Sequence, residues 1–323
     1  MASLTVPPVP TCPRQDAIEL HRAFKGFGCD STAVTNILAH RDAAQRQLIA
    51  HEYRAIYNQD LLRRLASELG GHHKRAVLLW VLDPAARDAT LLKQALASDV
   101  ATDLRAATEV VCSRTPAQLR ILRQAYRARF GCDAERDVAH RASGDHQRLL
   151  LACLAAAARG DAAAVDAAAA ALDARDLYRA GERRVGTDER AFVRVFAERG
   201  SWAHVAAVAR AYHGMYGRTL ERAVKSETSG SFRLGLLTVL RCAAECPARY
   251  FAGALRKAMK GVGTADAALV RVVVTRAEID MQYIKAEYHR MYKRSLADHI
   301  HSDTSGHYRT FLLSLVGRDR GYY

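Results

Sequence analysis

The segment RDAAQRQLIAHEYRAIY (residues 41–57) decides the fold, because three later segments of the chain repeat its pattern. Each segment begins with an arginine and continues as a helical run that contains aromatic residues. The later copies are RTPAQLRILRQAYRARF (114–130), RGSWAHVAAVARAYHGMY (199–216) and RAEIDMQYIKAEYHRMY (276–292). Self-similarity at a regular interval is the signature of a chain that is built from structural repeats.

A glycine follows each of the four arginines at nearly the same distance. The distances are 30, 30, 31 and 30 residues for the pairs Arg41–Gly71, Arg114–Gly144, Arg199–Gly230 and Arg276–Gly306. Apolar residues recur at spacings of three and four, as in Leu61, Leu62 and Leu65, and not with the alternation of a strand. The sequence therefore predicts an all-α fold of four units, each with about 70 residues and about five short helices.

The spacing of the repeats also predicts where the units begin and end. The interval between the second and third arginines is the longest, and it contains residues 155–171, of which 12 are alanine. Alanine is the best helix former, so this connector is expected to be helical. The predicted division is a short N-terminal segment (1–13), four repeats (14–83, 86–157, 171–243 and 246–317) and the alanine-rich connector (158–170).

Composition excludes several classes of protein. The chain has 323 residues, of which 50% are hydrophobic and 25% are charged, and only 7 prolines, so it is neither disordered nor collagen-like. Its seven cysteines form no CxxC pair and no zinc-type spacing, which indicates reduced thiols in a cytoplasmic protein. The first residues lack the pattern of a signal peptide, and the longest apolar run, 149–158, is too short to span a bilayer.

The net charge of +14 indicates an anionic partner, which the charge alone leaves open between nucleic acid, a membrane surface and an acidic protein. No RRM, KH or helix-turn-helix signature is visible, and the basic residues are spread over all four units. The sequence therefore predicts no specific nucleic-acid partner.

Three of the four units open with a glycine loop that precedes a helix. These loops are FKGFGCD (24–30) in unit one, GERRVGTD (181–188) in unit three and MKGVGT (259–264) in unit four. An acidic residue follows the last glycine of each loop after 40 or 41 residues, namely Glu68, Glu227 and Asp303.

This pairing of a loop with a distant acid suits calcium. Ca²⁺ takes six to eight oxygen ligands and accepts backbone carbonyls together with a bidentate carboxylate. Glycines allow a loop to curl so that successive carbonyls point at one spot. A single carboxylate leaves the site positively charged, so that a lipid phosphate can replace a water ligand. This chemistry predicts weak calcium binding in solution and stronger binding on an anionic bilayer.

The four units, the K-G-x-G loops and the distant acids resemble an annexin over nearly the whole chain. The stretch ILAHRDAAQRQLI (37–49) and the short N-terminus are similar to plant annexins, in which a role in stress responses is expected. The resemblance implies a curved disc of four five-helix repeats whose convex face carries the calcium loops. It implies calcium-dependent binding to anionic phospholipid by a cytoplasmic protein that becomes membrane-peripheral, without enzymatic turnover. Self-association on the membrane is left open.

The resemblance also implies calcium ligands, position by position. In units one and four they are loop carbonyls and one carboxylate, namely those of Phe24, Gly26, Gly28 and Glu68, and of Met259, Gly261, Gly263 and Asp303. Unit three is a third candidate through Gly181, Arg184, Gly186 and Glu227. Unit two has Ala97-Ser98-Asp99-Val100 in place of the loop and Arg141 in place of the acid, so it is not expected to bind calcium in this way.

Details of the loops leave two interpretations open. In unit one Cys29 stands where a threonine would cap the next helix, and Asp30 or Ser31 can cap it instead. The residues at the three loop tips, Phe27, Val185 and Val262, are either packed loop residues or side chains that dip into lipid headgroups.

A redox or peroxidase-type activity is the alternative function. His40 lies at the position that has prompted a peroxidase proposal in plant annexins, and Cys112 and Cys242 resemble a cysteine pair linked to redox behaviour. The structural interpretations are a histidine at a helix end and two buried thiols. No P-loop, GxSxG, HExxH or EF-hand sequence is present, so the sequence predicts no enzyme of those classes.

Histidines lie close in sequence to two of the acids. His72 and His73 follow Glu68, and His299, His301 and His307 surround Asp303. If these side chains lie on the membrane-facing side, their protonation predicts calcium-independent binding to anionic vesicles below about pH 6. The alternative is that they are solvated loop residues.

Overall fold

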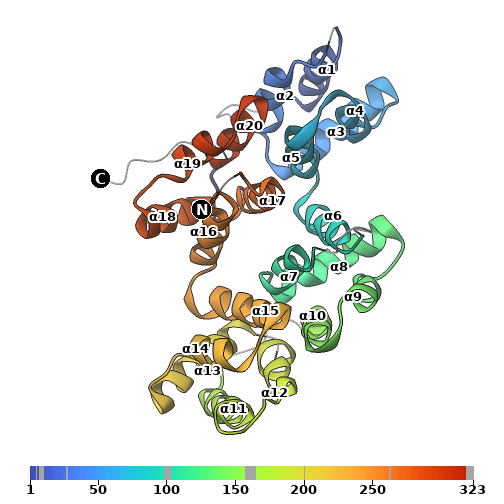
Figure 1. Ribbon diagram of the computed structural model, residues 1–323. Coiled ribbons are helices and arrows are strands. Elements are labelled where there is room, and N and C mark those ends of the chain that lie inside the picture. Colours follow the sequence, from blue (N-terminus) through green and yellow to red (C-terminus); the bar gives the residue numbers. More distant parts are fainter. Residues whose placement is uncertain are drawn as a thin grey trace. The chain divides into compact units, whose positions relative to one another are not determined.

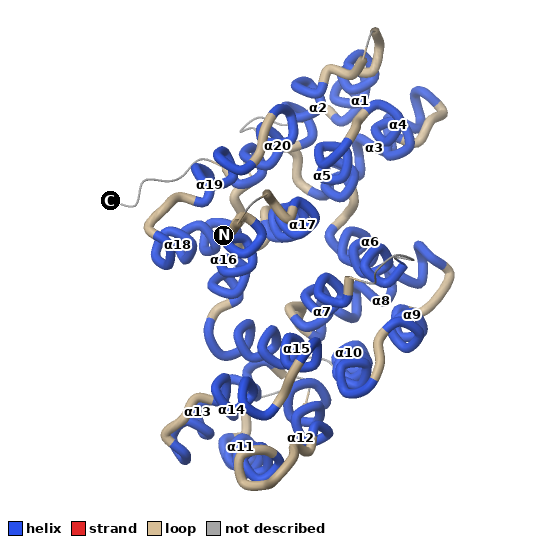
Figure 2. The backbone as a smooth tube through the Cα atoms, in the orientation of Figure 1, coloured by secondary structure: helices blue, strands red, loops and turns tan. Residues whose placement is uncertain are grey.

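The protein is helical throughout the part of the chain that its computed structural model describes, which is residues 1–4, 6, 11–26, 28–97, 103–156, 165–199, 201–261 and 263–317. Twenty α-helices and two π-helical turns occur there, and these residues form no strand (Figures 1 and 2). None of these helices is long and apolar enough to cross a bilayer. The predicted all-α fold is confirmed.

The helices group into two compact units along the chain, residues Met1–Arg87 with Phe251–Tyr323, and Asp88–Tyr250. The first unit holds repeat 1, with α1 (Pro13–Ala23), α2 (Ser31–Leu38), α3 (Ala43–Tyr57), α4 (Leu61–Glu68) and α5 (Gly71–Val81). It also holds most of repeat 4, with α16 (Pro247–Ala258), α17 (Asp266–Arg276), α18 (Met281–Tyr292), α19 (Leu296–Asp303) and α20 (Gly306–Val316). Helices α17 and α20 pack against α5 within this unit (Figure 1).

The second unit holds repeat 3 and most of repeat 2. Repeat 2 comprises α6 (Pro84–Ala97), α7 (Leu104–Cys112), α8 (Pro116–Phe130), α9 (Ala134–Arg141) and α10 (Gly144–Ala156). Repeat 3 comprises α11 (Ala167–Ala180), α12 (Glu189–Val193), α13 (Trp202–Tyr216), α14 (Leu220–Glu227) and α15 (Gly230–Leu240), with π-helical turns at Arg194–Glu198 and Arg241–Glu245. Residues 158–164 of the predicted connector (158–170) lie outside the described residues, and its last residues, 167–170, begin α11.

The glycines that mark the repeat in sequence have one structural role. Each begins the fifth helix of its repeat, and their φ angles are 56°, 59°, 56° and 57° at Gly71, Gly144, Gly230 and Gly306. L-residues with a side chain rarely adopt this left-handed backbone, so glycine is required there. The regular spacing in sequence therefore reflects a turn that recurs in all four repeats.

The recurring arginine ties the third helix to the first. Its guanidinium pairs with an aspartate of the first helix in repeats 1 to 3, through the pairs Arg41–Asp16 (2.7 Å), Arg114–Asp88 (2.6 Å) and Arg199–Asp173 (3.1 Å). Repeat 4 has Tyr250 near that position, and Arg276 instead pairs with Asp280 and lies 4.4 Å from the ring centroid of Phe251.

Trp80 on α5 organises the core of the first unit. Its ring is fully buried, and its indole N–H donates to the carbonyl of Leu38 at 2.7 Å. The guanidiniums of Arg46 and Arg87 lie 3.9 and 4.9 Å from the ring, and each contacts Glu278, at 3.0 and 3.2 Å. Burial lowers the pKa of Arg46. Two buried cations therefore share one carboxylate and one aromatic ring.

His73 on α5 is a core residue. Its side chain packs against Phe311 and His307 of α20, and only 8% of the residue is exposed. Burial, with a smaller contribution from His307, lowers its pKa to about 4. His299 is also buried, and its pKa is lowered. The expectation of solvent-facing, readily charged histidines is therefore wrong for these two.

The first prediction concerns the shared carboxylate. Glu278→Gln removes the carboxylate that the buried guanidiniums of Arg46 and Arg87 share, and it should cost about 3 kcal/mol of unfolding free energy. The control is Glu287→Gln, because Glu287 pairs with Arg290 at the surface. The control should leave the urea midpoint unchanged. An equal midpoint for the two variants would show that the buried cluster contributes nothing.

The second prediction concerns acid. The folded-state pKa of His73, about 4, lies below the ordinary value of 6.5, so the unfolded chain binds this proton first. The contribution of neutral His73 is complete above pH 6.5 and is lost as the pH falls towards 4, by at most about 3 kcal/mol. His73→Gln should flatten urea stability across that window, whereas His51→Gln, a change of an exposed histidine, should not. Equal slopes in wild type and His73→Gln would contradict this assignment.

Candidate functional site

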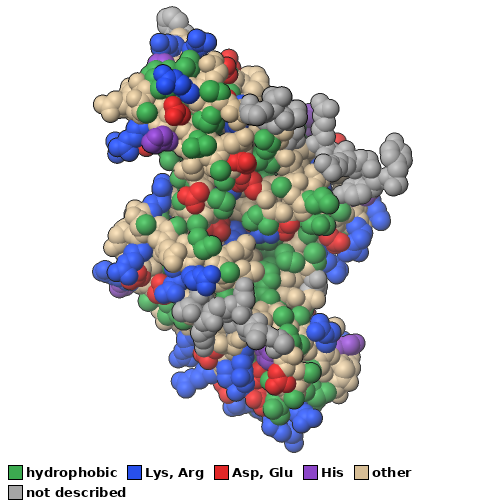
Figure 3. Space-filling view, turned by 180° about the vertical axis from the view of Figure 1, so that it is seen from behind, with side chains coloured by type: hydrophobic (Ala, Val, Ile, Leu, Met, Phe, Trp, Pro, Cys, Tyr) green, Lys and Arg blue, Asp and Glu red, His purple; other side chains and the backbone are tan. Residues whose placement is uncertain are grey.

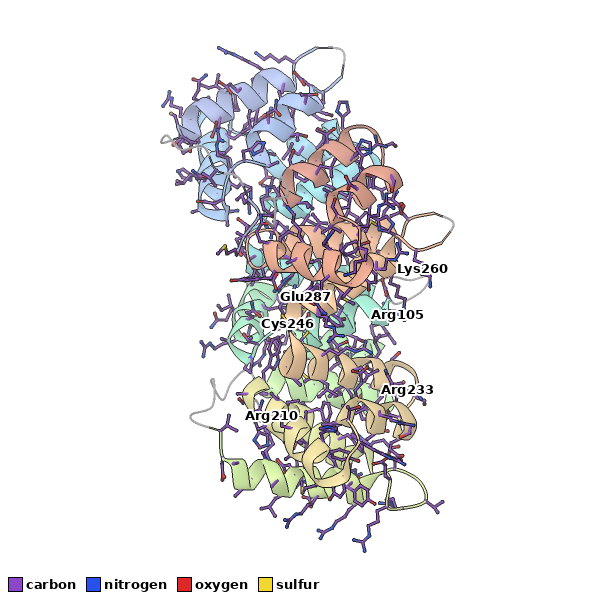
Figure 4. The ribbon with its side chains drawn as sticks, turned by 90° about the vertical axis from the view of Figure 1, so that its left-hand side faces the viewer. Arg105, Arg210, Arg233, Cys246, Lys260 and Glu287 are labelled. Carbon is purple, nitrogen blue, oxygen red and sulfur yellow. The ribbon has the colours of Figure 1, made fainter. Side chains whose placement is uncertain are left out.

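The three glycine loops close in the same way. A backbone N–H just before the second helix donates to the last carbonyl of the first helix, through Asp30 to Ala23 (2.9 Å), Asp188 to Ala180 (2.8 Å) and Ala265 to Ala258 (2.8 Å). The loop glycines have φ angles from 79° to 126°, at Gly26, Gly28, Gly186, Gly261 and Gly263. Lys260, labelled in Figure 4, is exposed on the loop that follows α16.

Each distant acid is the last residue of the fourth helix of its repeat, Glu68 of α4, Glu227 of α14 and Asp303 of α19. The carboxylates of Glu68 and Asp303 are partly exposed, at 17% and 22%. A Cβ on Gly181 would lie 2.7 Å from Cγ of Glu227. The fold therefore brings each acid to its loop across about forty residues of sequence.

Repeats 3 and 4 hold their acids with matching contacts. The hydroxyl of Thr187 donates to the carbonyl of Glu227 at 2.9 Å and lies 3.4 Å from its Oε2. The hydroxyl of Thr264 donates to the carbonyl of Asp303 at 3.0 Å and lies 3.5 Å from its Oδ2. The longer loop of repeat 3 thus ends in the same arrangement as the loop of repeat 4.

Repeat 1 differs at two positions. Cys29 replaces the threonine, and burial, then the charges of Glu68 and Asp30, raise the pKa of its thiol. Asp30 caps α2 by accepting from the N–H groups of Thr32 and Ala33, which resolves the alternative between Asp30 and Ser31. The guanidinium of Arg64 donates to the carbonyl of Phe24 at 3.1 Å and lies 2.9 Å from Oε1 of Glu68.

Two acids therefore have a nitrogen-bearing neighbour on their own helix. Sequence reasoning placed His299 near Asp303 without identifying its contact with the carboxylate, and it missed the contact of Arg64 with Glu68. In repeat 4, Nε2 of His299 lies 3.7 Å from Oδ1 of Asp303, and its ring also hydrogen-bonds with the Met259 backbone and with Tyr288. Arg64 and His299 both stand four residues before the acid. Residues i and i+4 share one helix face, so this spacing was a signal that could have found them.

Repeat 2 holds a different arrangement. Asp137 of α9 accepts from Lys93 at 2.7 Å and from Tyr126 at 2.5 Å. Burial, together with this hydrogen bond, raises the pKa of Tyr126. Arg141 ends α9, where the other repeats have the acid. Residues 98–102, which include most of the expected loop replacement, lie outside the described residues.

The donors at these loops fit calcium. They are backbone carbonyls and one carboxylate per loop, a hard oxygen set of the kind that Ca²⁺ accepts. Within the described ranges, no group of three or more His, Cys, Asp or Glu side chains is arranged to hold a metal ion. A calcium site at these loops therefore needs the backbone carbonyls. Of the loop tips, Val185 is fully exposed, and Phe27 and Val262 are not among the described residues.

The residues of the redox alternative are in a different setting. Cys112 and Cys242 are buried in the second unit, at 1% and 2% exposure. A hydrogen bond with Cys153, together with burial, raises the pKa of the Cys112 thiol well above its usual range. His40 follows the end of α2. A thiol held protonated in this way is a poor nucleophile.

Comparisons with known proteins agree with this geometry. The annexin family profile matches residues 15–80, 87–153, 172–239 and 250–315. Annexin D5 of Arabidopsis thaliana is 48% identical over 317 residues, which cover 98% of this chain and 99% of that protein. The solved structure of annexin III aligns with a TM-score of 0.93 at 33% identity, covering 98% and 97% of the two chains. A calcium-bound annexin (Sm)1 aligns with a TM-score of 0.83 at 29% identity, covering 99% and 94%. The four repeats, the loop geometry and these similarities together show that the chain belongs to the annexin family, in its plant type.

Proposed function

We propose that this annexin binds calcium through the loops of repeats 1, 3 and 4 and thereby docks on anionic phospholipid. The observation that carries the proposal is the shared arrangement of the three loops, each closed by the same backbone bond and each joined by an acid at the end of the fourth helix. The annexin family is known for calcium-dependent phospholipid binding, and a calcium-bound member aligns with this chain.

The ligands in this proposal are the residues that the sequence indicated. They are the carbonyls of Phe24, Gly26 and Gly28 with Glu68, and the carbonyls of Met259, Gly261 and Gly263 with Asp303. The matching threonine contacts of Glu227 and Asp303 support the third site, formed by Gly181, Arg184, Gly186 and Glu227.

Membrane docking follows from the charge of these sites. One carboxylate neutralises only half of the calcium charge, so a lipid phosphate is a favourable further ligand. Basic residues near the surface add about 1 kcal/mol each on an anionic membrane. Figure 3 shows Lys and Arg interspersed with acidic and apolar side chains on the face that it displays, which fits a lipid surface better than a nucleic-acid groove. The fully exposed Val185 supports the proposal that this loop tip enters the headgroup region.

The third prediction concerns the acids. Glu68→Gln with Asp303→Asn should raise the calcium concentration needed for binding to anionic vesicles by at least roughly tenfold, about 1.4 kcal/mol. Adding Glu227→Gln should remove most of the remainder. The measurement is co-sedimentation with anionic and neutral vesicles, with circular dichroism to confirm intact helices. Asp298→Asn is the matched control, because this exposed aspartate lies on the same helix as Asp303. Normal sedimentation of the triple variant at micromolar calcium would refute the proposed sites.

The fourth prediction concerns the enzymatic alternative. The Cys112 thiol is buried and its pKa is raised, which disfavours a reactive thiolate, and His40 lies just after the end of α2. We therefore propose docking without turnover. Purified, metal-stripped protein should show no peroxidase activity above that of free haem. A stoichiometric haem absorption band that disappears in His40→Ala would establish the alternative instead.

A further inference from the structure

We propose that Arg64 is a built-in competitor of calcium at the loop of repeat 1, so that this loop has a lower calcium affinity than an uncompeted loop such as that of repeat 3. The inference rests on the proposed function, because it concerns the ligands of the same site. In this proposal the side chain of Arg64 sets the calcium affinity of the repeat 1 loop.

The guanidinium contacts two ligands at once. The Nη2 atom of Arg64 donates to the carbonyl oxygen of Phe24 at 3.1 Å, and it lies 2.9 Å from Oε1 of Glu68. Calcium would bind the same two oxygens at 2.3 to 2.6 Å. One positively charged nitrogen therefore lies between the oxygens that the ion must reach, and calcium binding requires the guanidinium to leave.

Repeats 3 and 4 have other residues at the position of Arg64, four residues before the acid. The residue four before the acid is Arg64 in repeat 1, Ala223 in repeat 3 and His299 in repeat 4. Ala223 offers no side-chain donor, and the Glu227 carboxylate instead has the hydroxyls of Thr187 and Ser226 as neighbours, at 3.4 and 3.1 Å. Arginine remains charged at every physiological pH. Among these three loops, repeat 1 is thus the one with a permanent cation at this position.

The contacts that hold Arg64 allow it to be displaced. About a third of its side chain, 34%, is exposed, so a path to solvent exists. Its Nε–H group is buried and makes no hydrogen bond, so this group does not stabilise the guanidinium in the loop. Displacement gives up one hydrogen bond to the Phe24 carbonyl, one ion pair to Glu68 and a cation–π contact at 5.8 Å from the centroid of the Phe24 ring, and the freed guanidinium is solvated. The competitor therefore weakens calcium binding and does not abolish it.

The test isolates the first loop in the full chain. Glu227→Gln and Asp303→Asn together silence the loops of repeats 3 and 4, and calcium binding by this background is measured by isothermal titration calorimetry with calcium chloride. Arg64→Ala in the background should raise the calcium affinity about fivefold, and at least threefold. Arg64→Gln, which removes the charge but keeps a hydrogen-bond donor, should raise it as well. Arg64→Lys, which keeps the charge, should stay within about twofold of the background.

Two controls separate the possible outcomes. Arg63→Ala removes the same charge from the neighbouring, exposed position, and it should leave the affinity within about twofold. Glu68→Gln in the same background should abolish binding. If Glu68→Gln has no effect, the proposed calcium site itself is refuted. If Glu68→Gln abolishes binding but Arg64→Ala and Arg64→Gln leave the affinity unchanged or lower it, the site stands and the competitor is refuted.

A second measurement does not depend on the calorimetric signal. Binding to the folded state alone raises the thermal unfolding midpoint with ligand concentration. The calcium-induced rise in midpoint should be larger for Arg64→Ala than for the background, while the midpoint without calcium should be equal or lower because an ion pair is lost. A calcium-induced rise that is equal in the two proteins would refute the inference.

Discussion

The turn that follows the fourth helix is the constraint on which both the fold and the site depend. The helix ends at residue 68, 141, 227 or 303, the next residue is extended, and a glycine in left-handed conformation begins the fifth helix two residues later. In three repeats a side chain three residues after that glycine donates to the extended residue's carbonyl, through Gln147 to Ala142, Arg233 to Thr228 and Arg309 to Thr304. The same turn thus ends the helix at the acid and directs the next helix into the core.

The sequence predicted the parts of the molecule that depend on local backbone conformation. The glycines that begin the fifth helices satisfy a backbone requirement that recurs in all four repeats. The loop glycines and the acids stand at matching spacings in repeats 1, 3 and 4. Features that depend on contacts distant in sequence were not predictable in this way. The burial of His73 requires α20 to pack on α5, and the sharing of Glu278 by Arg46 and Arg87 joins residues more than 190 positions apart. The reach of Arg64 to Phe24 likewise depends on a side-chain conformation, which no spacing encodes.

The repeats keep the backbone and vary the charge around it. A fully buried tyrosine of the third helix recurs at positions 53, 126, 212 and 288, and its hydroxyl has a different partner each time. The partners are His21, Asp137, Glu182 and His299. Burial raises the pKa of all four tyrosines, to about 12 for Tyr288, and contact with a carboxylate raises it further at Tyr126 and Tyr212, so each hydroxyl stays protonated. A neutral tyrosine hydroxyl can hydrogen-bond to a carboxylate or to a histidine without a change in the packing of its ring.

Because the backbone and the tyrosine packing stay constant while the charged side chains vary, the four repeats can have four different electrostatic environments. Repeat 2 places an acid, Asp137, four residues before an arginine, and repeat 1 places Arg64 four residues before an acid. The helices, the turn and the tyrosine are the same in these two repeats although the charges are exchanged, and the charged side chains of both are partly exposed. Ion pairs in such positions contribute little to folding. Substitution there therefore changes what a loop can bind at a small cost in stability, whereas substitution of the left-handed glycines would strain the backbone in every environment.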